Sequence, residues 1–309
     1  MSSEKISVVI PCYFSEKTIA PIVHKVEDVL EKEKYDYEVI LVDDGSKDRT
    51  FDQIQKLAKE NQHIKGVRFS KNFGQHAALM AGYKYSSGDI IVGLNDDGEQ
   101  DPSDMIKLIS KIKEGYDYVC AKHQLKKHAF FKRLGSRFNN YCCIHFLNQP
   151  SNFRFSSYYA MTRFLINELI KNNNPFINVN GLILTITQNV TDVEIPAYER
   201  KEGQSGYSLR KSILLWANSF TAYTAAPLHL NIYIGILFGV LSILGLLVMI
   251  LLFIASQKVG AIILLFLAFL CFAFSLLFIM QGLMGEYVAR TYMLLNGKQQ
   301  FVMKESINL

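Results

Sequence analysis

Two patterns of apolar residues alternate along the first third of the chain. Short continuous apolar runs predict four strands that are buried on both faces of a sheet, at Ile6–Pro11, Tyr37–Val42, Gly66–Phe69 and Ile90–Leu94. Between and after these runs the apolar residues recur at helical spacing, at 19–30, 51–57, 77–82 and 105–112. This alternation predicts an α/β domain with a mostly parallel sheet whose faces are both covered by helices.

The fourth predicted strand ends in acidic residues. Asn95, Asp96 and Asp97 follow its apolar run, and in open α/β sheets the ligand crevice lies at this end of the strands. Two unit charges about 4 Å apart repel by roughly 4 kcal/mol at an effective dielectric constant of about 20. A hard divalent cation, Mg²⁺ or Mn²⁺, would offset this repulsion and bring substrate phosphates with it. The alternative is a solvated acidic turn that caps a helix beginning at Pro102.

The second predicted strand also ends in acid, with the sequence Asp43-Asp44-Gly45-Ser46. These carboxylates are expected near the acidic end of the fourth strand, because the carboxyl ends of parallel strands meet at one edge of a sheet. A nucleotide and a metal ion both fit such an edge. One Asp can accept a hydrogen bond from a base or ribose while another holds the ion.

The C-terminal part of the chain has a different composition. Hydrophobic residues make up 50% of the 309 residues, and neither Ile232–Ala255 nor Val259–Met284 contains a charged residue. Each stretch is longer than the roughly 20 residues that span a bilayer, so the sequence predicts two C-terminal transmembrane helices. No apolar segment precedes the first strand, and no signal peptide is expected.

Basic residues predict the orientation of these helices. They precede the first span, at Arg200, Lys201, Arg210 and Lys211, and follow the second, at Arg290, Lys298 and Lys304. The loop between the spans carries only Lys258. The positive-inside rule therefore predicts an integral protein of the inner or plasma membrane, with the N-terminal domain and both termini in the cytoplasm.

Charge, cysteines and small residues add three expectations. The net charge of +5 suits an anionic membrane surface better than nucleic acid. The five cysteines show no metal-ligand spacing, and packing roles in a reducing compartment are expected of them. Gly235, Gly239 and Gly245 in the first span permit close helix packing and hence a homo-oligomer.

Four motifs occur in a fixed order along the N-terminal domain. They are Pro11-x-Tyr13-x-x-Glu16, Val42-Asp43-Asp44-Gly45-Ser46-x-Asp48-x-Thr50, Asn72-Phe73-Gly74 and the acidic end of the fourth strand. In this order they resemble the family 2 glycosyltransferases. Residues 203–211 before the first span and 285–292 after the second are similar to the polyprenyl-phosphate glycosyltransferases, a group that includes the dolichol-phosphate mannose synthases. The resemblance covers nearly the whole chain.

The resemblance implies a nucleotide-diphospho-sugar transferase (GT-A) fold over residues 1–208. An interfacial amphipathic helix over 209–228 and a two-helix transmembrane region with a short cytoplasmic tail over 229–309 would follow. The implied activity is that of a metal-dependent glycosyltransferase of the hexosyltransferase type. It would transfer a sugar, with inversion, from a nucleotide sugar that is most often linked to UDP, to a polyprenyl phosphate in the membrane.

The functional residues of the family carry over onto matching positions. Asp43 is expected to reach the base and Glu16 the ribose, and the nucleotide site as a whole would comprise Pro11, Tyr13, Glu16, Asp43 and Asp96. Asp97, with Asn95, is expected to bind Mg²⁺ or Mn²⁺. The residues expected at the reaction centre are Asp97, Asn152 and Arg154, and those expected to bind the acceptor phosphate are Arg154, Arg200, Arg210 and Lys211.

The metal strand departs from the family's pattern. The family usually has Asp-Ala-Asp-Leu-Gln-x-Pro, whereas this chain has Asn95-Asp96-Asp97-Gly98-Glu99-Gln100-Asp101-Pro102. Aligned at the strand end, the metal pair is Asn95 and Asp97. Aligned at the Gln and Pro of the motif, it is Asp96 and Gly98. We prefer the first register because glycine has no side chain with which to bind metal.

Asn152 is the second departure, because relatives commonly have at this position an Asp that is proposed as the catalytic base. An amide cannot take the proton of a sugar hydroxyl. A phosphate monoester has a second pKa of about 6, is anionic at neutral pH and can attack without a base. Transfer to a hydroxyl of a lipid-linked glycan and a non-catalytic membrane partner remain alternatives. A processive polysaccharide synthase is not expected, because its Gln-x-x-Arg-Trp motif is absent around Trp216.

Overall fold

The computed structural model describes residues 4–123, 144, 149–151, 153–175, 177–196, 259–295, 297 and 299–309. The chain forms two compact units, residues 1–222 together with 299–309, and residues 223–298. Several predicted features lie outside the described residues: the interfacial helix at 209–228, the first membrane span, Asn152, Arg200, Arg210 and Lys211.

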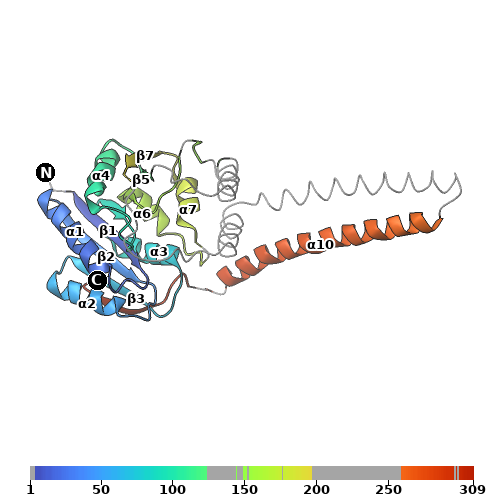
Figure 1. The fold of residues 1–309 in the computed structure, drawn as a ribbon, viewed down its shortest axis with the longest axis horizontal. Coiled ribbons are helices and arrows are strands. Elements are labelled where there is room, and N and C mark those ends of the chain that lie inside the picture. Colours follow the sequence, from blue (N-terminus) through green and yellow to red (C-terminus); the bar gives the residue numbers. More distant parts are fainter. Residues whose placement is uncertain are drawn as a thin grey trace. The chain divides into compact units, whose positions relative to one another are not determined.

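An eight-stranded sheet forms the centre of the first unit (Figure 1). Its strands are β1 Lys5–Cys12, β2 Asp36–Asp43, β3 Ile64–Phe69, β4 Ile90–Gly93, β5 Tyr118–His123, β6 Tyr159–Thr162, β7 Val190–Ile195 and β8 Met303–Ile307. They lie in the order β7-β5-β6-β4-β1-β2-β3-β8. The four strands predicted from apolar runs are β1 to β4, and they run parallel to one another. The predicted mostly parallel α/β sheet is confirmed, with β6 and β8 antiparallel to their neighbours.

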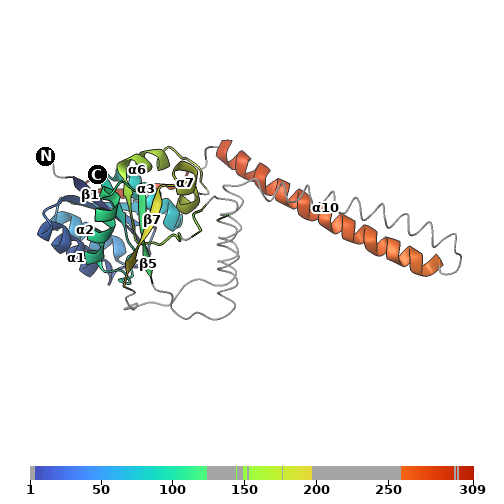
Figure 2. The same cartoon turned by 90° about the horizontal axis from the view of Figure 1, so that it is seen from above.

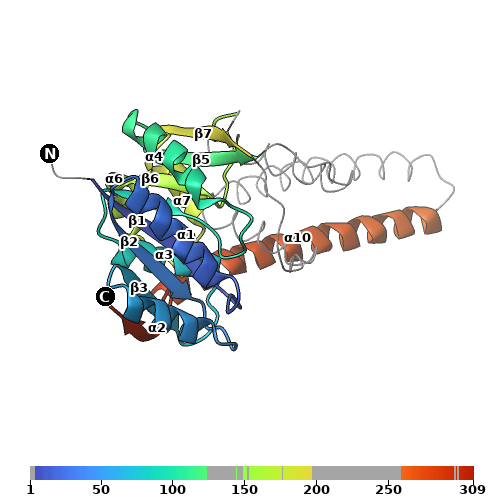
Figure 3. The same ribbon diagram turned by 60° about the vertical axis from the view of Figure 1, so that its left-hand side comes forward.

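Helices cover both faces of this sheet (Figures 2 and 3). They are α1 Ile19–Lys32, α2 Thr50–Glu60, α3 Gln75–Tyr85, the 3₁₀ helix η1 Pro102–Asp104, α4 Met105–Lys113, α6 Arg163–Leu169 and α7 Val179–Ile186. Apolar residues of α1, α2 and α4 share one core cluster with Ile6, Val8 and Ile10 of β1. On the opposite face α3 packs so closely that a Cβ atom at Gly82 would lie 2.2 Å from Val9 Cγ1. Successive side chains of β1 therefore enter two different cores.

The last residues of the chain form β8 at the edge of the sheet, beside β3 (Figure 1). The sequence predicted only a short tail here. Ile307 fits against Gly66, where an added Cβ atom would lie 2.7 Å from the Ile307 side chain. The Asn308 side chain then donates hydrogen bonds to the Ala58 and Ile64 carbonyl oxygens, at 2.7 and 2.9 Å. Sequence periodicity does not predict a strand of only five residues whose partner lies more than 200 residues away along the chain.

Within the second unit the structure describes one long helix, α10 Val259–Leu295. It includes the second predicted membrane span. Among the described residues, Phe272–Leu295 of this helix is the one candidate span by length and composition, with a mean hydropathy of 1.4.

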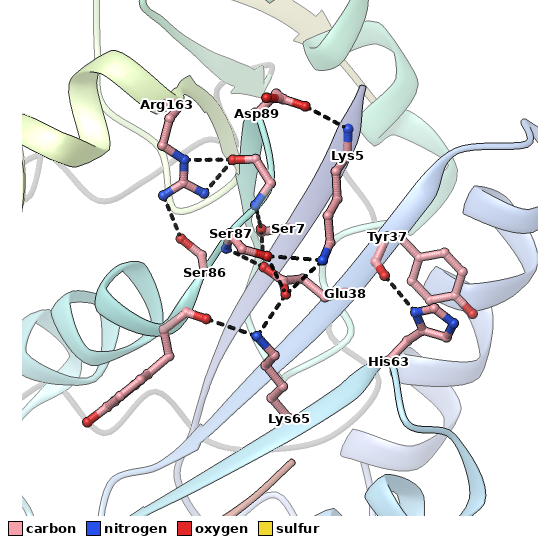
Figure 4. A network of polar contacts seen from close by, with 12 residues as sticks. Lys5, Ser7, Tyr37, Glu38, His63, Lys65, Ser86, Ser87, Asp89 and Arg163 are labelled. Carbon is pink, nitrogen blue, oxygen red and sulfur yellow. Dashed lines mark hydrogen bonds and ion pairs between the residues drawn. The ribbon is translucent and has the colours of Figure 1, made fainter. Parts of the chain in front are cut away.

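A buried polar network joins the parallel strands near their amino ends (Figure 4). At its centre Glu38 of β2 accepts hydrogen bonds from the Ser7 hydroxyl at 2.6 Å and from the Ser87 backbone N–H. The ammonium groups of Lys65 and Lys5 lie 2.9 and 3.4 Å from the same carboxylate. Burial by itself would raise the pKa of Glu38, but the hydrogen bonds and Lys65 outweigh it and lower the pKa to about 2. The ionised carboxylate thus links β1, β2, β3 and the turn before β4.

We expect Glu38→Gln to lower the thermal unfolding temperature of the full-length chain by about 4 to 8 °C near neutral pH. The pKa of this carboxyl is about 2 in the folded chain, and about 4.3 when unfolded. Its stabilisation is therefore complete above the unfolded pKa and is lost as the pH falls through the folded pKa. In unfolding scans the difference between variant and wild type should shrink below about pH 4.

The control for this prediction is Glu114→Gln, which removes an exposed ion pair with Lys111. It should shift the unfolding temperature by less than about 1 °C. A difference between Glu38→Gln and wild type that stays constant between neutral pH and pH about 2 would contradict the ionised network.

Candidate active site

A cavity of about 330 Å³ opens at the carboxyl ends of the parallel strands. Its lining comes from the end of β1, the loops after β2 and β3, the first turn of α3 and the loop after β4. The lining residues are Pro11, Cys12, Tyr13, Asp44, Asn72, Gly74, Gln75, Ala78, Asn95, Asp96 and Asp97. The predicted residues Pro11, Tyr13, Asn95, Asp96 and Asp97 are thus brought together around one space.

The cavity lies where the strand order reverses. From β1 the chain adds β2 and β3 on one side, and then crosses to place β4 on the other side of β1. The loops after β1 and β4 therefore turn away from each other and leave a crevice. In open α/β sheets this switch point is the usual ligand site.

Asp96 joins the loop after β4 to the loop after β1. Its Oδ2 accepts a hydrogen bond from the Tyr13 backbone N–H at 2.9 Å and another from the Ser15 hydroxyl. Burial raises the pKa of Asp96, the charge of Asp97 adds to this, and the two hydrogen bonds oppose it. The contact fixes the backbone of Tyr13, a residue that is 48% exposed, at the cavity.

Asp44 makes the corresponding contact with the loop after β3. Its two carboxylate oxygens accept hydrogen bonds from the Phe73 and Gly74 backbone N–H groups at 2.6 and 2.8 Å. Burial raises the pKa of Asp44 to about 6, with a further contribution from Asp43, against the effect of these bonds. Gly45 permits the close approach of the two loops, because its φ is +69° and an added Cβ would lie 2.4 Å from a backbone carbon of Lys71.

Asn95 and Asp97, the predicted metal pair, lie in the loop after β4. The Asn95 Oδ1 accepts a hydrogen bond from the Gln75 side chain at 3.2 Å, and its Nδ2 donates to Ser157 Oγ at 3.0 Å. Asp97 Oδ1 accepts from the Glu99 backbone N–H at 3.1 Å, which closes an Asx turn. The loop therefore presents Asp97 to the cavity on a locally braced backbone.

The acidic residues of the cavity suit a metal ion that arrives with its substrate. Among the side chains that the structure describes, no group of three or more His, Cys, Asp or Glu is placed to hold an ion. Asp96 and Asp97 nevertheless line the same cavity. Magnesium sites commonly use one or two carboxylates and complete their coordination with substrate phosphates and water. The chemistry of the residues present therefore fits a divalent ion bound to a diphosphate.

Arg154 lies on a segment that is anchored on both sides. Phe153 and Phe155 pack edge-on against the Tyr118 ring of β5, with ring centroids 6.0 and 5.5 Å apart, and Arg154 between them is exposed. Ser157 in the same segment accepts the hydrogen bond from Asn95 at the end of β4. Arg154 is not among the residues that line the cavity, but its segment is tied to the acidic strand end.

Two predicted nucleotide residues do not line the cavity. Asp43 is fully buried, and its Oδ1 accepts a hydrogen bond from the Ser46 backbone N–H at 2.9 Å. Glu16 accepts one from the Arg49 backbone N–H at 3.3 Å, at the start of α2. The direct base and ribose contacts expected of them stay predictions. Asp44, for which no role was predicted, lines the cavity instead, and its place one residue beyond the end of β2 is the signal that could have identified it.

The model of the family described as "Glycosyl transferase family 2" matches residues 7–177 of this chain. The chain belongs to this family. The matched range includes every segment that lines the cavity. This family 2 glycosyltransferase is 29% identical over 294 residues to the undecaprenyl-phosphate 4-deoxy-4-formamido-L-arabinose transferase of Proteus mirabilis (strain HI4320). That alignment covers 93% of this chain and 89% of the relative.

Solved structures share the fold of this glycosyltransferase. Glucosyl-3-phosphoglycerate synthase from Mycobacterium tuberculosis, in complex with Mn²⁺, UDP and phosphoglyceric acid, matches with a TM-score of 0.54 at 19% identity, over 71% of this chain and 76% of its own. Mannosyl-3-phosphoglycerate synthase from Rubrobacter xylanophilus matches with a TM-score of 0.51 at 14% identity, over 70% and 71%. The prediction is confirmed as a GT-A-like α/β fold with a mostly parallel sheet, and the two C-terminal transmembrane helices stay a prediction.

We expect Gly45→Ala to lower the thermal unfolding temperature by about 5 °C more than the matched variant Gly115→Ala. Both glycines have a positive φ, which costs an added side chain about 1 kcal/mol. Only at Gly45 would the new Cβ also collide with a neighbouring loop, since nothing lies within 4 Å of the position at Gly115. Unfolding scans of the two variants check this expectation, and equal shifts would contradict the close approach of the loops.

Proposed function

We propose that this glycosyltransferase transfers a sugar, with inversion at the anomeric carbon, from a nucleotide diphosphate sugar to a polyprenyl phosphate at the cytoplasmic face of the membrane. The observation that carries the proposal is the carboxylate-lined cavity at the switch point, in a chain that aligns over 93% of its length with an undecaprenyl-phosphate transferase. We propose UDP as the nucleotide, since the structural neighbour from M. tuberculosis binds UDP-glucose with Mn²⁺.

The nucleoside is proposed to bind between Tyr13 and Asp44, beside Pro11. The exposed Tyr13 ring offers a flat surface for stacking. The pKa of Asp44, at about 6, leaves its carboxylate mostly ionised at neutral pH and able to accept a hydrogen bond from the base or ribose. Asp43 and Glu16 are proposed to support the nucleotide through the loops whose backbone amides they bind.

Asp97, with Asn95 beside it, is proposed to hold Mg²⁺ or Mn²⁺ against the donor diphosphate. When bound, the ion would neutralise the negative charge that develops on the leaving diphosphate. Asp96 is already bound to the loop after β1 and is proposed to orient the nucleotide relative to that loop. The remaining contribution of the protein is positioning and fixed electrostatics around the anomeric carbon.

The acceptor phosphate is proposed to bind Arg154 together with Arg200, Arg210 and Lys211. A guanidinium group matches phosphate oxygens with its planar pair of donors. The anionic phosphate oxygen forms the new bond to the anomeric carbon while the bond to the diphosphate oxygen breaks, and the electron pair leaves with the nucleoside diphosphate. No proton has to be removed, so Asn152 is proposed to orient the acceptor rather than act as a base.

Membrane attachment is proposed to bring enzyme and lipid acceptor together. The proposed spans are Ile232–Ala255 and Val259–Met284, the second of which lies in α10. Within α10, Phe272–Leu295 has the required length and hydropathy. The proposed order is a transferase domain over 1–208, an interfacial helix over 209–228 and the membrane region after it, with the termini and transferase domain in the cytoplasm. The final strand β8 then returns to the transferase sheet.

We expect Asp97→Ala to reduce sugar transfer by about a hundredfold or more, and excess chelator to abolish it, because the donor diphosphate would face the remaining carboxylates uncompensated. The control is Asp52→Ala, which removes an exposed carboxylate in the first turn of α2 that does not line the cavity. Mass analysis of the lipid product with a panel of sugar nucleotides measures the effect. A loss at Asp96→Ala that spares Asp97→Ala would favour the other register, and turnover in excess chelator would contradict the metal site.

We expect Arg154→Gln to raise the KM for polyprenyl phosphate by about ten- to a hundredfold, because hydrogen bonds to a charged group contribute about 1.5 to 3 kcal/mol. Arg154→Lys should recover part of the loss, and Lys171→Gln, which alters an exposed lysine paired with Glu168, should have no effect. An unchanged acceptor KM in Arg154→Gln would remove this residue from the acceptor site.

With donor saturating, so that ionisation of Asp44 does not limit nucleotide binding, the acidic limb of the rate profile should follow the acceptor phosphate near a pH of about 6. It should survive in Asn152→Ala and Asn152→Asp, since neither change affects the nucleophile. If neutralising Glu99, Asp101 or Glu202 removed the limb, a carboxylate base would be at work. Transfer to a sugar hydroxyl would then be the better interpretation.

A further inference from the structure

Four residues on adjacent strands form one row across the sheet. In the strand register Cys12 of β1 pairs with Asp43 of β2, Asp43 pairs with Arg68 of β3, and Arg68 pairs with Glu305 of β8. Residues paired in this way have side chains on the same face of the sheet and interact directly. The row begins at a residue that lines the cavity and ends on the strand that follows α10.

Charges alternate along this row. The Arg68 guanidinium lies 3.5 Å from Asp43 Oδ2 through Nε and 3.4 Å from Glu305 Oε1 through a terminal nitrogen. Arg68 also lies over the Phe51 ring, 5.2 Å from its centroid. One cation thus serves two carboxylates, of which Asp43 is fully buried and Glu305 is 39% exposed.

The buried carboxylate depends on Arg68 for its charge balance. Asp43 Oδ1 accepts the hydrogen bond from the Ser46 backbone N–H, whereas Oδ2 is buried and has no hydrogen-bond partner among the described residues. Among the ion pairs of the described residues, the one with the Arg68 guanidinium offsets the charge at Oδ2. A buried carboxylate that loses its cation is strongly destabilised. Movement of Arg68 would therefore be transmitted to Asp43 and to the turn that Asp43 holds.

Two links connect this turn to the cavity. Ser46 Oγ accepts a hydrogen bond from the Phe14 backbone N–H at 3.1 Å, and Phe14 follows Tyr13 at the cavity. Phe14 has a φ of 57°, a conformation that a bulky residue keeps only when its surroundings enforce it. A shift of Asp43 would therefore change the position of the loop that is proposed to contact the nucleoside.

The far end of the row is held by contacts of the C-terminal segment. The Phe301 ring stacks on Phe69 of β3 with centroids 5.0 Å apart, and the Ser70 backbone N–H donates to the Val302 carbonyl at 2.9 Å. Asn308 ties down the other end of β8 through its two hydrogen bonds. Glu305 is thereby fixed beside Arg68.

We propose that Arg68 is a positioning residue of the donor site and that Glu305, on the strand after the predicted membrane region, holds Arg68 in place. Donor affinity in this enzyme then depends on the docked C-terminal strand. The inference rests on the proposed function in one respect, that the cavity binds a nucleotide.

The test compares Glu305→Gln and Asn308→Ala in the full-length chain. Both alter β8, but only the first removes a charge from Arg68. Binding of UDP with Mn²⁺ should weaken about two- to fivefold in Glu305→Gln, as expected for loss of a partly exposed ion pair, and should be unchanged in Asn308→Ala. Hydrogen exchange at the Ser46 amide, measured without ligand, should become faster only in Glu305→Gln.

Exchanging the two charges distinguishes positioning of Asp43 by Arg68 from a simple effect on the pairing of β3 with β8. The double variant Arg68→Glu with Glu305→Arg restores opposite charges between β3 and β8 but places a carboxylate beside Asp43. Its donor affinity should stay at least about tenfold below wild type. Recovery of wild-type affinity, or equal loss in Asn308→Ala and Glu305→Gln, would overturn the proposal. If the wild-type chain did not bind UDP, the proposed donor would be rejected. If the Ser46 amide still exchanged faster in Glu305→Gln, the coupling between Glu305 and the turn at Ser46 would be supported.

Discussion

Hydrogen bonds from backbone amides to carboxylates at the strand ends hold the active-site loops of this glycosyltransferase. Asp96 after β4 binds the loop after β1, and Asp44 after β2 binds the loop after β3. Each contact crosses from one strand to the loop of another, so the cavity walls are fixed relative to one another by charge-assisted bonds. The rest of the site, including the placement of Tyr13 and Asp97, depends on these loops keeping their positions.

The charges of the same two carboxylates are only partly stabilised by the fold. Burial raises the pKa values of Asp44 and Asp96, because their charged forms are poorly solvated at these positions. Backbone amides offset part of that cost. Under the proposed function, a divalent ion held at Asp97 would bring positive charge next to Asp96 when the donor binds. At the amino ends of the strands the Glu38 carboxylate has different partners. It accepts hydrogen bonds from serine hydroxyls and lies beside Lys65 and Lys5.

The edge strand β8 gives the C-terminus a structural role in the catalytic unit. A sheet edge exposes unpaired backbone groups, and β8 covers that of β3. The chain that leaves α10 at Leu295 re-enters the first unit by residue 299. The strand that follows the predicted membrane region thus belongs to the catalytic sheet, and its Glu305 is connected to Asp43 through Arg68.

The sequence by itself determined the strands β1 to β4, the helices between them, the acidic strand ends and the family, because buried strands and amphipathic helices leave periodic apolar patterns and the site motifs are local. Only the tertiary structure decided that Asp44 rather than Asp43 lines the cavity, that Asp96 binds the loop after β1, and that β8 completes the sheet. These outcomes depend on pairings between segments far apart in the chain. Side-chain direction at a strand end and long-range strand register are set by packing against such partners, and no local pattern encodes them.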